Sequence, residues 1–426
     1  MTENMITIAK KSKEAFLKMM NLDTSIKNKA LASIATKLKE NKENIFKANK
    51  EDLKEAQNLL DNGEINKATF DRLKLNESKL NDLVKGLNDL IHLDDPANKV
   101  LWAKELDKDL ILKKVTVPIG VIGVIFEARP DCFIQISSLI IKSGNCAILK
   151  GGRECTKTNT IFYELLKEAL REVEGFPQNV ISLVYTREDV KNMLEFDEYI
   201  SLIIPRGGNK LVKFIKENTK IPVLGHASGI CHTFIDSDCD FENTKKIIID
   251  AKTQYPSACN ATETLLIHKD YKFINELKSA LNDAQIKIIE NPENYSTEYG
   301  DKILSLKIVN NVDDAIEHIN KFGSGHTDSI LSNNNEHIEK FMNLVDSSSV
   351  FSNCSTRFSD GFRYGFGAEV GISTNKTHAR GPVGLEGLTI YKYKLYGSNN
   401  IVDDYAKGIK TFTHKTLQRG YNDKSI

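Results

Sequence analysis

The sequence lacks an excess of charge of either sign. Lysine plus arginine and aspartate plus glutamate each number 58 in 426 residues, so the formal net charge is zero. A protein that binds nucleic acid normally carries a basic surplus or a basic stripe. Here the lysines of the first hundred residues are interleaved with glutamates, as on a solvated helix face. We therefore expect no nucleic acid partner.

Long apolar runs and paired cysteines are also missing. The longest apolar stretch, Val121–Phe126, has the length of a strand and is too short to cross a bilayer. The N-terminus shows no basic patch followed by an apolar run, so it does not resemble a secretory signal. Seven cysteines occur without a CxxC pair, which suits free thiols in a reducing compartment. These absences predict a cytoplasmic protein with no membrane partner.

The nine histidines form neither an HExxH motif nor an HxH pair. We interpret His226 and His232, which lie near Gly225 and Gly229, as structural or supporting residues. The sequence therefore predicts no metal.

What the sequence does contain is an alternation of helix and strand signals. Two apolar stripes, within 26–38 and 80–91, predict amphipathic helices in the first hundred residues. From Val121 onward, short apolar runs alternate with amphipathic helices, a pattern typical of βαβ units and a doubly wound parallel sheet. A second stretch of this kind begins near Lys252, and the chain is long enough for two domains.

Two segments with the alternation of amphipathic strands stand apart from these α/β stretches. They are Ile111–Val117 and Leu388–Tyr393. We expect them to pair with each other or with a sheet edge of another subunit.

Cys259 is the candidate nucleophile. It lies in Gln254-Tyr-Pro-Ser-Ala-Cys-Asn-Ala-Thr-Glu263, directly before a predicted strand at Thr264–Ile267. Small neighbours at a loop-to-strand junction leave a thiol accessible, and a thiolate is both a strong nucleophile and a good leaving group. From residue type alone, a small buried core residue is the commoner role of a free cysteine, and we assign the other six to packing.

Two glycine-containing segments are candidate phosphate sites. Gly207 and Gly208 follow a predicted strand and open a helix whose N–H groups could face a phosphate, although paired glycines also mark ordinary turns. Lys150 ends the predicted strand Cys146–Leu149 and is followed closely by Arg153. Ligands gather beyond the carboxyl ends of such strands, so these cations could hold a ribose and an extra phosphate. A solvated lysine at a strand end is the alternative.

Six motifs occur in a fixed order along nearly the whole chain. They read Val117-Pro-Ile-Gly-Val-Ile-Gly-Val-Ile-Phe-Glu-Ala-Arg-Pro130, Leu149-Lys-Gly-Gly-Arg-Glu154, Ile204-Pro-Arg-Gly-Gly-Asn209, Cys259-Asn-Ala-Thr-Glu-Thr264, Phe322-Gly-Ser-Gly-His-Thr-Asp328 and His378-Ala-Arg-Gly-Pro-Val-Gly-Leu-Glu-Gly-Leu388. In this combination the chain resembles the γ-glutamyl phosphate reductases, a family of the aldehyde dehydrogenase superfamily.

The resemblance implies an aldehyde-dehydrogenase-like α/β fold with two doubly wound α/β domains and a small β oligomerisation flap. The expected NADP-binding domain comprises residues 1–99 and 119–251, and the expected catalytic domain residues 252–384. Oligomerisation strands are expected in 100–118 and 385–397, followed by a C-terminal tail at 398–426.

The resemblance also implies roles for single residues. Cys259 matches the family's nucleophile, and Arg153 beside Lys150 favours NADPH as the cofactor. The implied cofactor-binding residues are Lys150, Arg153, Gly207, Gly208 and Glu298.

Two departures from hydrolytic aldehyde dehydrogenases carry chemical meaning. The place of their general-base glutamate is taken by Val223, so no carboxylate there would activate water against a thioester. Their oxyanion asparagine has no counterpart in Phe126-Glu-Ala-Arg-Pro130, which leaves the backbone N–H of Cys259 as the default oxyanion donor.

We therefore expect NADPH-dependent reduction of γ-glutamyl 5-phosphate to glutamate-5-semialdehyde through a cysteine thioester, the second step of proline biosynthesis. Arg129 and Arg357 are the candidates for binding the anionic substrate, ahead of Arg363 and Arg380, and a structural salt bridge is the alternative for each. A homo-oligomer, dimer or tetramer, and a glutamate kinase are the expected partners. Two alternatives remain: a coenzyme-A-acylating aldehyde dehydrogenase, or a non-catalytic ligand-binding protein that kept the fold.

Overall fold

The structure is a computed structural model that describes residues 4–226, 228–366 and 368–417. The chain divides into two compact units. Unit 1 contains the described residues of 1–204, 219–222 and 384–426, and unit 2 contains those of 205–218 and 223–383. Each unit holds a parallel sheet covered by helices, and unit 1 also carries a small antiparallel sheet. These sheets confirm the expected α/β fold class.

Helices form the first part of unit 1. They are α1 (Met5–Met19), α2 (Thr24–Glu40), α3 (Lys42–Asp61), α4 (Lys67–Leu73) and α5 (Glu77–His92). Asparagine or aspartate side chains cap the starts of α1, α2, α4 and α5. The buried faces of α2 and α5 coincide with the two predicted apolar stripes, which confirms both helices. None of the helices in the described ranges has both the length and the apolar character that crossing a bilayer demands.

The parallel sheet of unit 1 has the strand order β5-β4-β3-β6. Its strands are β3 (Val121–Phe126), β4 (Cys146–Lys150), β5 (Ile181–Val184) and β6 (Leu202–Arg206), linked by α6 (Asp131–Ser143), the 3₁₀ turn η1 (Arg153–Cys155), α7 (Thr156–Arg171) and α8 (Arg187–Glu195). Every residue of β3 is buried, as a continuous apolar run in a covered parallel sheet requires.

One side chain ties the helical layer to this sheet. Asp52 of α3 accepts hydrogen bonds from the backbone N–H groups of Lys157 and Thr158, at 3.1 and 2.8 Å, in the first turn of α7. A carboxylate at that position also matches the positive end of the helix dipole. Asp52 thereby fixes the helix that follows Lys150 and Arg153.

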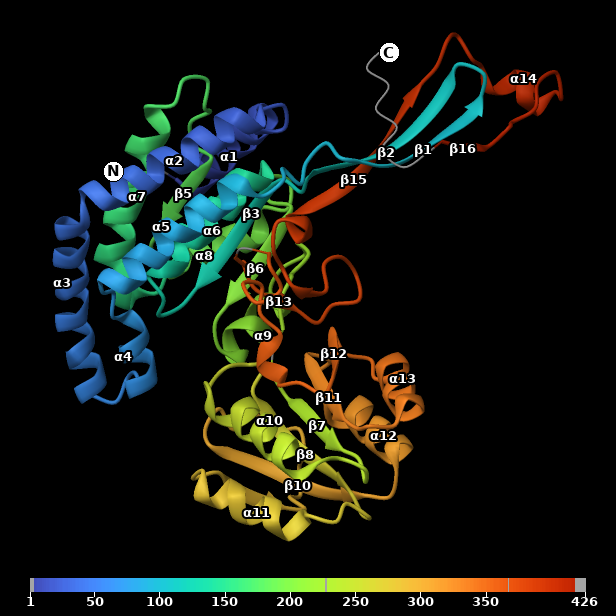
Figure 1. Cartoon of the computed structure of the whole chain (residues 1–426). Helices are drawn as coiled ribbons and strands as arrows, with labels where there is room; N and C mark the ends of the chain where they lie inside the picture. The colour runs from blue at the N-terminus through green and yellow to red at the C-terminus, as the bar shows by residue number, and fades with distance from the viewer. Residues whose placement is uncertain (1–3, 227, 367, 418–426) are drawn as a thin grey trace. The chain divides into compact units, whose positions relative to one another are not determined.

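The antiparallel sheet of unit 1, called the flap here, has the order β15-β2-β1-β16. Its strands are β1 (Val100–Asp107), β2 (Leu110–Pro118), β15 (Thr389–Tyr396) and β16 (Lys415–Leu417) (Figure 1). The short helix α14 (Val402–Ala406) lies between β15 and β16 in the chain. The predicted pairing of the two isolated segments is confirmed, with Ile390 opposite Val117. The tail expected at 398–426 is not separate, because β16 pairs with β1; residues 418–426 lie outside the described part of the chain.

The parallel sheet of unit 2 has the order β12-β11-β7-β8-β10-β9. The strands are β7 (Cys231–Ile235), β8 (Thr262–His268), β9 (Lys287–Glu290), β10 (Ile303–Val309), β11 (Thr327–Leu331) and β12 (Ser349–Ser352). Unit 2 also contains α9 (Asn209–Glu217), α10 (Phe241–Thr253), α11 (Ile274–Asp283), α12 (Val312–Phe322), α13 (Asn335–Leu344), the turn η2 (Thr356–Phe358), β13 (Ile372–Ser373) and β14 (Gly381–Pro382). The 3₁₀ turn η3 (Glu386–Leu388) belongs to unit 1.

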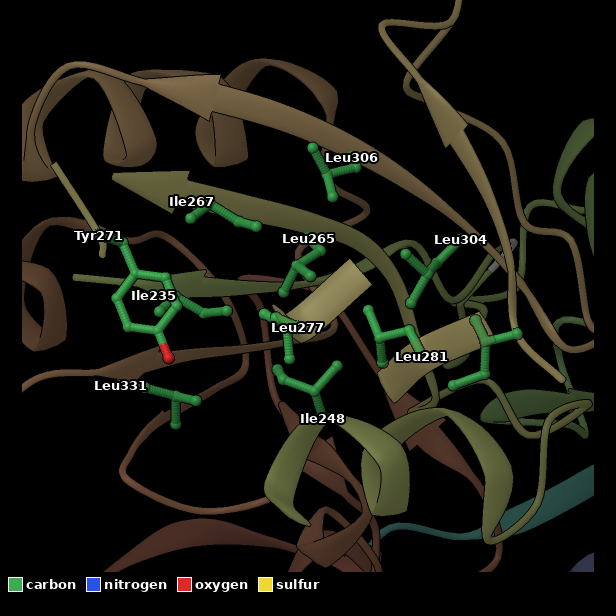
Figure 2. Close-up of a cluster of buried hydrophobic side chains, with 11 residues drawn as sticks. Ile235, Ile248, Leu265, Ile267, Tyr271, Leu277, Leu281, Leu304, Leu306 and Leu331 are labelled. Carbon is green, nitrogen blue, oxygen red and sulfur yellow. The ribbon is translucent and has the colours of Figure 1, made fainter. Parts of the chain in front are cut away.

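Alternating side chains of this sheet build two apolar layers. Ile235, Leu265 and Leu331 point to the face covered by α10 and α11, where they meet Ile248 and Leu277 (Figure 2). The neighbouring residues Phe234, Leu266 and Ile330 point to the opposite face, against α12 and α13. Because strand side chains alternate, one strand supplies both layers. The sheet is therefore held rigidly from both sides, which suits a platform for a site.

The expected domain boundary at residues 251 and 252 differs from the observed one. β7 and α10 were assigned to the NADP-binding domain, but β7 pairs with β8 and β11 in the interior of the unit 2 sheet. The units change at residues 204–205, 218–219 and 222–223 instead. Backbone hydrogen bonds to strands on both sides decide this placement. The cofactor and catalytic roles of the two units stay predictions.

Candidate active site

Cys259 lies in a turn of unit 2 between α10 and β8, three residues before the strand begins. Cys259 is partly exposed, whereas four other cysteines are buried: Cys132, Cys146, Cys155 and Cys231. The location agrees with the predicted loop-to-strand junction, and the thiol is not enclosed by the apolar core. An accessible thiol on a rigid support is the arrangement that nucleophilic catalysis requires.

Neutral groups hold the backbone of Cys259. The buried Cys231 thiol donates to the Cys259 carbonyl oxygen, with Sγ and O 3.2 Å apart. Burial raises the pKa of Cys231 well above its usual value, so this thiol keeps its proton. Gly229 passes so close that a Cβ there would lie 2.0 Å from the same carbonyl oxygen. Only glycine permits this approach, and it fixes the turn that carries Cys259.

Two histidine rings lie beside the thiol. His226 and His326 pack edge to face with ring centroids 4.8 Å apart. One ring nitrogen of each and the Cys259 Sγ lie within 4.8 Å of one another. Burial lowers the pKa of His226, which keeps its imidazole neutral near pH 7. Sequence reasoning did not place His226 at Cys259 and did not single out His326 at all.

The segment that carries Glu298 is held by a buried ion pair. Lys252 and Glu263 are both fully buried, and Lys252 Nζ lies 2.8 Å from Glu263 Oε2. The two carboxylate oxygens of Glu263 also accept the backbone N–H groups of Tyr299 and Gly300, at 3.2 and 3.3 Å. Burial raises the pKa of Glu263 to about 7, against the attraction of Lys252. Glu263 thus fixes the peptide directly after Glu298.

Glu298 itself is half-buried and lies near enough to His226 to raise that histidine's pKa electrostatically. Arg206 and Glu369 act on the same ring. The guanidinium of Arg206 donates to the Glu369 carbonyl oxygen at 3.2 Å. Glu298, the predicted ribose-binding glutamate, therefore lies near His226, and His226 lies near Cys259. All three residues belong to unit 2.

Arg357 lies near enough to Cys259 for the two groups to interact electrostatically. Burial and then the Arg363 cation lower its pKa, while negative charge on Cys259 raises it. Its Nε donates to Gln254 Oε1 at 2.9 Å, and its guanidinium lies over the Tyr255 ring. No described carboxylate forms an ion pair with it. A buried guanidinium without a carboxylate is suited to an anionic ligand.

The two weaker arginine candidates make contacts within the protein. Arg363 donates to the Arg357 carbonyl oxygen at 2.7 Å, so it supports the backbone of its neighbour. Arg380 donates to Asp346 through both the carbonyl oxygen and the carboxylate, at 2.9 and 3.1 Å. These contacts match the alternative role given for Arg380, a structural salt bridge.

Three predicted residues lie in unit 1, and each is described within that unit. Lys150 is the half-buried last residue of β4, at the carboxyl end of the parallel sheet. Arg153 is exposed and pairs with Glu64 at 2.6 Å, so its guanidinium is engaged at the surface. Arg129 is half-buried in the loop between β3 and α6.

Gly207 and Gly208 are exposed at the start of α9 in unit 2. Gly208 is the N-cap residue of this helix. A Cβ at Gly208 would meet no atom within 4 Å. The open approach and the positive end of the helix suit a phosphate group.

Known proteins resemble the chain over nearly its whole length. The aldehyde dehydrogenase family model matches residues 2–303. The γ-glutamyl phosphate reductase of Brachyspira hyodysenteriae is 56% identical, covering 97% of this chain and 100% of that protein. The one of Acetivibrio thermocellus is 51% identical, covering 96% and 97%. The crystal structure of γ-glutamyl phosphate reductase from Thermotoga maritima superposes with a TM-score of 0.89 at 37% identity, covering 94% of this chain and 100% of that one.

Proposed function

This chain belongs to the γ-glutamyl phosphate reductases within the aldehyde dehydrogenase family, and we propose that it reduces γ-glutamyl 5-phosphate to glutamate-5-semialdehyde. The reaction releases phosphate and forms the second step of proline biosynthesis. One observation carries the proposal beyond the likeness to relatives: Cys259 is partly exposed on a turn whose backbone is fixed by Cys231 and Gly229.

The chemistry of the chain's own residues follows from that turn. The Cys259 thiolate attacks the acyl carbon, the carbon–oxygen bond to phosphate breaks, and a thioester forms. Covalent capture divides one difficult acyl reduction into two easier steps. Val223 occupies the place of the water-activating glutamate, and its carbonyl oxygen accepts a hydrogen bond from Asn375 Nδ2 at 2.8 Å. No carboxylate at this position promotes hydrolysis, so the thioester persists long enough to be reduced.

Anion binding is the proposed role of Arg357 and Arg129. The substrate carries a phosphate and an α-carboxylate, and both suit the planar fork of a guanidinium. Arg357 has the stronger support, because it is buried near Cys259 and has no described carboxylate partner. The backbone N–H of Cys259 stays our proposed donor to the oxyanion.

The proposed cofactor is NADPH, which supplies the hydride when bound. The chain offers Lys150 for the adenosine ribose, the N-terminal end of α9 at Gly208 for a phosphate, and Glu298 for the nicotinamide ribose. The open space beside Gly208 and the support of Glu298 by Glu263 fit these roles. Arg153 contributes to the preference for NADPH only if it exchanges its exposed partner Glu64 for a phosphate.

A cytoplasmic homo-oligomer, dimer or tetramer, completes the proposal, with a glutamate kinase as a separate partner. The flap supports the oligomer, because Tyr391, Tyr393 and Leu395 of its edge strand β15 are exposed. Large exposed apolar side chains on an edge strand mark a surface that another chain can cover.

Reverse turnover tests the proposal. Purified protein, NADP and glutamate-5-semialdehyde should produce NADPH only when inorganic phosphate is present, because phosphate must release the acyl group from Cys259. Addition of coenzyme A in place of phosphate should give no turnover. Strict dependence on coenzyme A would instead support the acylating aldehyde dehydrogenase, and folded protein with no turnover under either condition would support a non-catalytic role.

A further inference from the structure

The cluster of His226, Cys259 and His326 has a property that acyl reduction does not use. Its three candidate ligand atoms, one sulfur and two ring nitrogens, lie within 4.8 Å of one another. The three residues come from separate parts of unit 2: the segment before β7, the turn before β8 and the segment before β11. Sulfur and imidazole nitrogen are the donors that Zn²⁺ prefers in proteins.

The ring of His226 is held by a backbone partner. Its Nδ1 lies 2.9 Å from the carbonyl oxygen of Ile372. A carbonyl oxygen only accepts, so Nδ1 carries the hydrogen and Nε2 keeps a lone pair. An imidazole whose second nitrogen donates to a carbonyl is the usual state of a metal-binding histidine, because that bond fixes the ring and its tautomer.

In His326, Nδ1 has two hydrogen-bonding neighbours, whereas Nε2 has none among the described residues. The ring is fully buried, and Nδ1 faces Thr327 Oγ1 at 2.8 Å and Cys231 Sγ at 3.8 Å. Cys231 donates its S–H hydrogen bond to the Cys259 carbonyl oxygen, so its sulfur can accept a hydrogen bond from His326 Nδ1. His326 Nε2 is buried and has no hydrogen-bond partner among the described residues. A buried nitrogen in that state is costly unless something binds it.

We propose that His226, Cys259 and His326 form a zinc site, and that Zn²⁺ bound there holds the proposed reductase in a reversible inactive state. The inactivation rests on the proposed role of Cys259, whereas the binding does not. Usual Zn–S and Zn–N lengths in a tetrahedron put ligand atoms roughly 3.5 Å apart. The observed separations of up to 4.8 Å are longer than that spacing, so binding requires the partly exposed Cys259 and His226 side chains to move closer together.

Zinc binding and catalysis exclude each other at this sulfur. Zn²⁺ binds the thiolate, so the thiol proton passes to solvent and the sulfur lone pair is committed to the metal. Such a sulfur cannot attack an acyl carbon. The fourth position of the tetrahedron stays open for water, because the cluster offers three protein ligands.

The binding is tested with Co²⁺ as the probe. Full-length protein, freed of metal with a chelator and kept anaerobic, should bind one Co²⁺ and show a thiolate-to-cobalt charge-transfer band that Zn²⁺ removes. The band should vanish in Cys259→Ser and persist in Cys354→Ser, a matched change at another partly exposed cysteine of unit 2. His226→Asn and His326→Asn should each weaken binding about 100-fold, since loss of even an outer partner costs 10–100-fold.

A band that persists in Cys259→Ser, or affinities unchanged in both histidine variants, would overturn the site. If His326→Asn does not fold, the partly exposed His226→Asn carries the same test.

Alkylation separates the zinc site from the proposed reaction. Zn²⁺ should slow iodoacetamide modification of Cys259, measured by peptide mass, and a chelator should restore the original rate. This readout needs no turnover, so it stands even if the reductase activity is refuted. An unchanged alkylation rate at saturating Zn²⁺ would refute zinc ligation by Cys259. In the active enzyme, Zn²⁺ should also abolish turnover until the chelator is added; full activity with the alkylation blocked would refute the inactive state.

Discussion

Lys252→Met tests the buried ion pair that supports the Glu298 segment. Lys252 and Glu263 are both fully buried and lie 2.8 Å apart. Methionine keeps much of the volume and removes the cation, so the Glu263 carboxylate is left unpaired in a desolvated place. Breaking a buried pair in this way costs about 3–5 kcal/mol. The variant should therefore lose about that much stability where Glu263 is ionised.

The loss should depend on pH in a definite direction. Glu263 has a pKa of about 7 in the folded protein and an ordinary value of 4.5. The folded state therefore holds an extra proton between these values, and the contribution of Glu263 to stability falls as pH rises through this window. The difference between these two pKa values corresponds to about 3 kcal/mol of stability, which the wild-type protein loses as pH rises through the window. Without Lys252 the folded pKa of Glu263 rises further, so near pH 5 both proteins hold the proton and the destabilisation should be small. At pH 8 the variant keeps the proton that the wild type has lost, which limits this part of the destabilisation to about 1.4 kcal/mol.

Urea unfolding followed by circular dichroism at both pH values measures the effect. Lys245→Met is the matched control, because Lys245 lies on the same helix and pairs with the exposed Glu242. That change should cost no more than about 1 kcal/mol at either pH. Adding Glu263→Gln to Lys252→Met removes the unpaired charge and should recover most of the loss at pH 8. Equal losses at the two pH values, or a loss at pH 8 no larger than the control's, would refute the reasoning.

Three further predictions concern the proposed reaction. Cys259→Ser should abolish reduction and leave NADPH binding intact in a fluorescence titration; appreciable turnover would count against the thioester. Val223→Glu should supply a water-activating base, so γ-glutamyl phosphate should yield free glutamate by chromatography; folded variant that forms none would contradict the assignment of this position. Arg357→Lys keeps the charge but loses the fork, and should raise KM for the acyl phosphate about 10-fold or more. Arg380→Lys, whose arginine is paired with Asp346, should leave KM unchanged.

Strands with a continuous apolar run are among those predicted correctly. β3, β4 and β8 fall close to their expected residues, because each is buried on both faces of its sheet. β7 gave no such signal, since His232 and Thr233 stand in its middle. These polar side chains are buried only because Asp328 and Thr262 satisfy them across the sheet. Partners so distant in the chain cannot be read from a local pattern.

The residues of the candidate site show the same contrast between what a local pattern predicts and what only the fold brings together. The partly exposed turn position of Cys259 was predictable, because its local surroundings, small residues before a strand, carry that information. His326 was not, because it becomes a neighbour of Cys259 only through the parallel order of β11, β7 and β8. Glu263 lies within a quoted motif, yet its support of the Glu298 segment depends on the fold that brings Tyr299 and Gly300 to it.

Two neighbouring thiols, Cys231 and Cys259, differ in burial, and this difference bears on the proposed nucleophile. Cys231 and Cys259 are joined through a hydrogen bond to a carbonyl oxygen, but burial raises the pKa of Cys231 well above its usual value. Cys231 therefore remains a protonated donor under conditions in which a thiolate is needed for attack. Its neutrality also removes a negative charge that would repel an anionic acyl phosphate from the adjacent sulfur. The buried cysteine thus fixes the position of Cys259 without competing with it, and the difference in exposure between the two favours Cys259 as the proposed nucleophile.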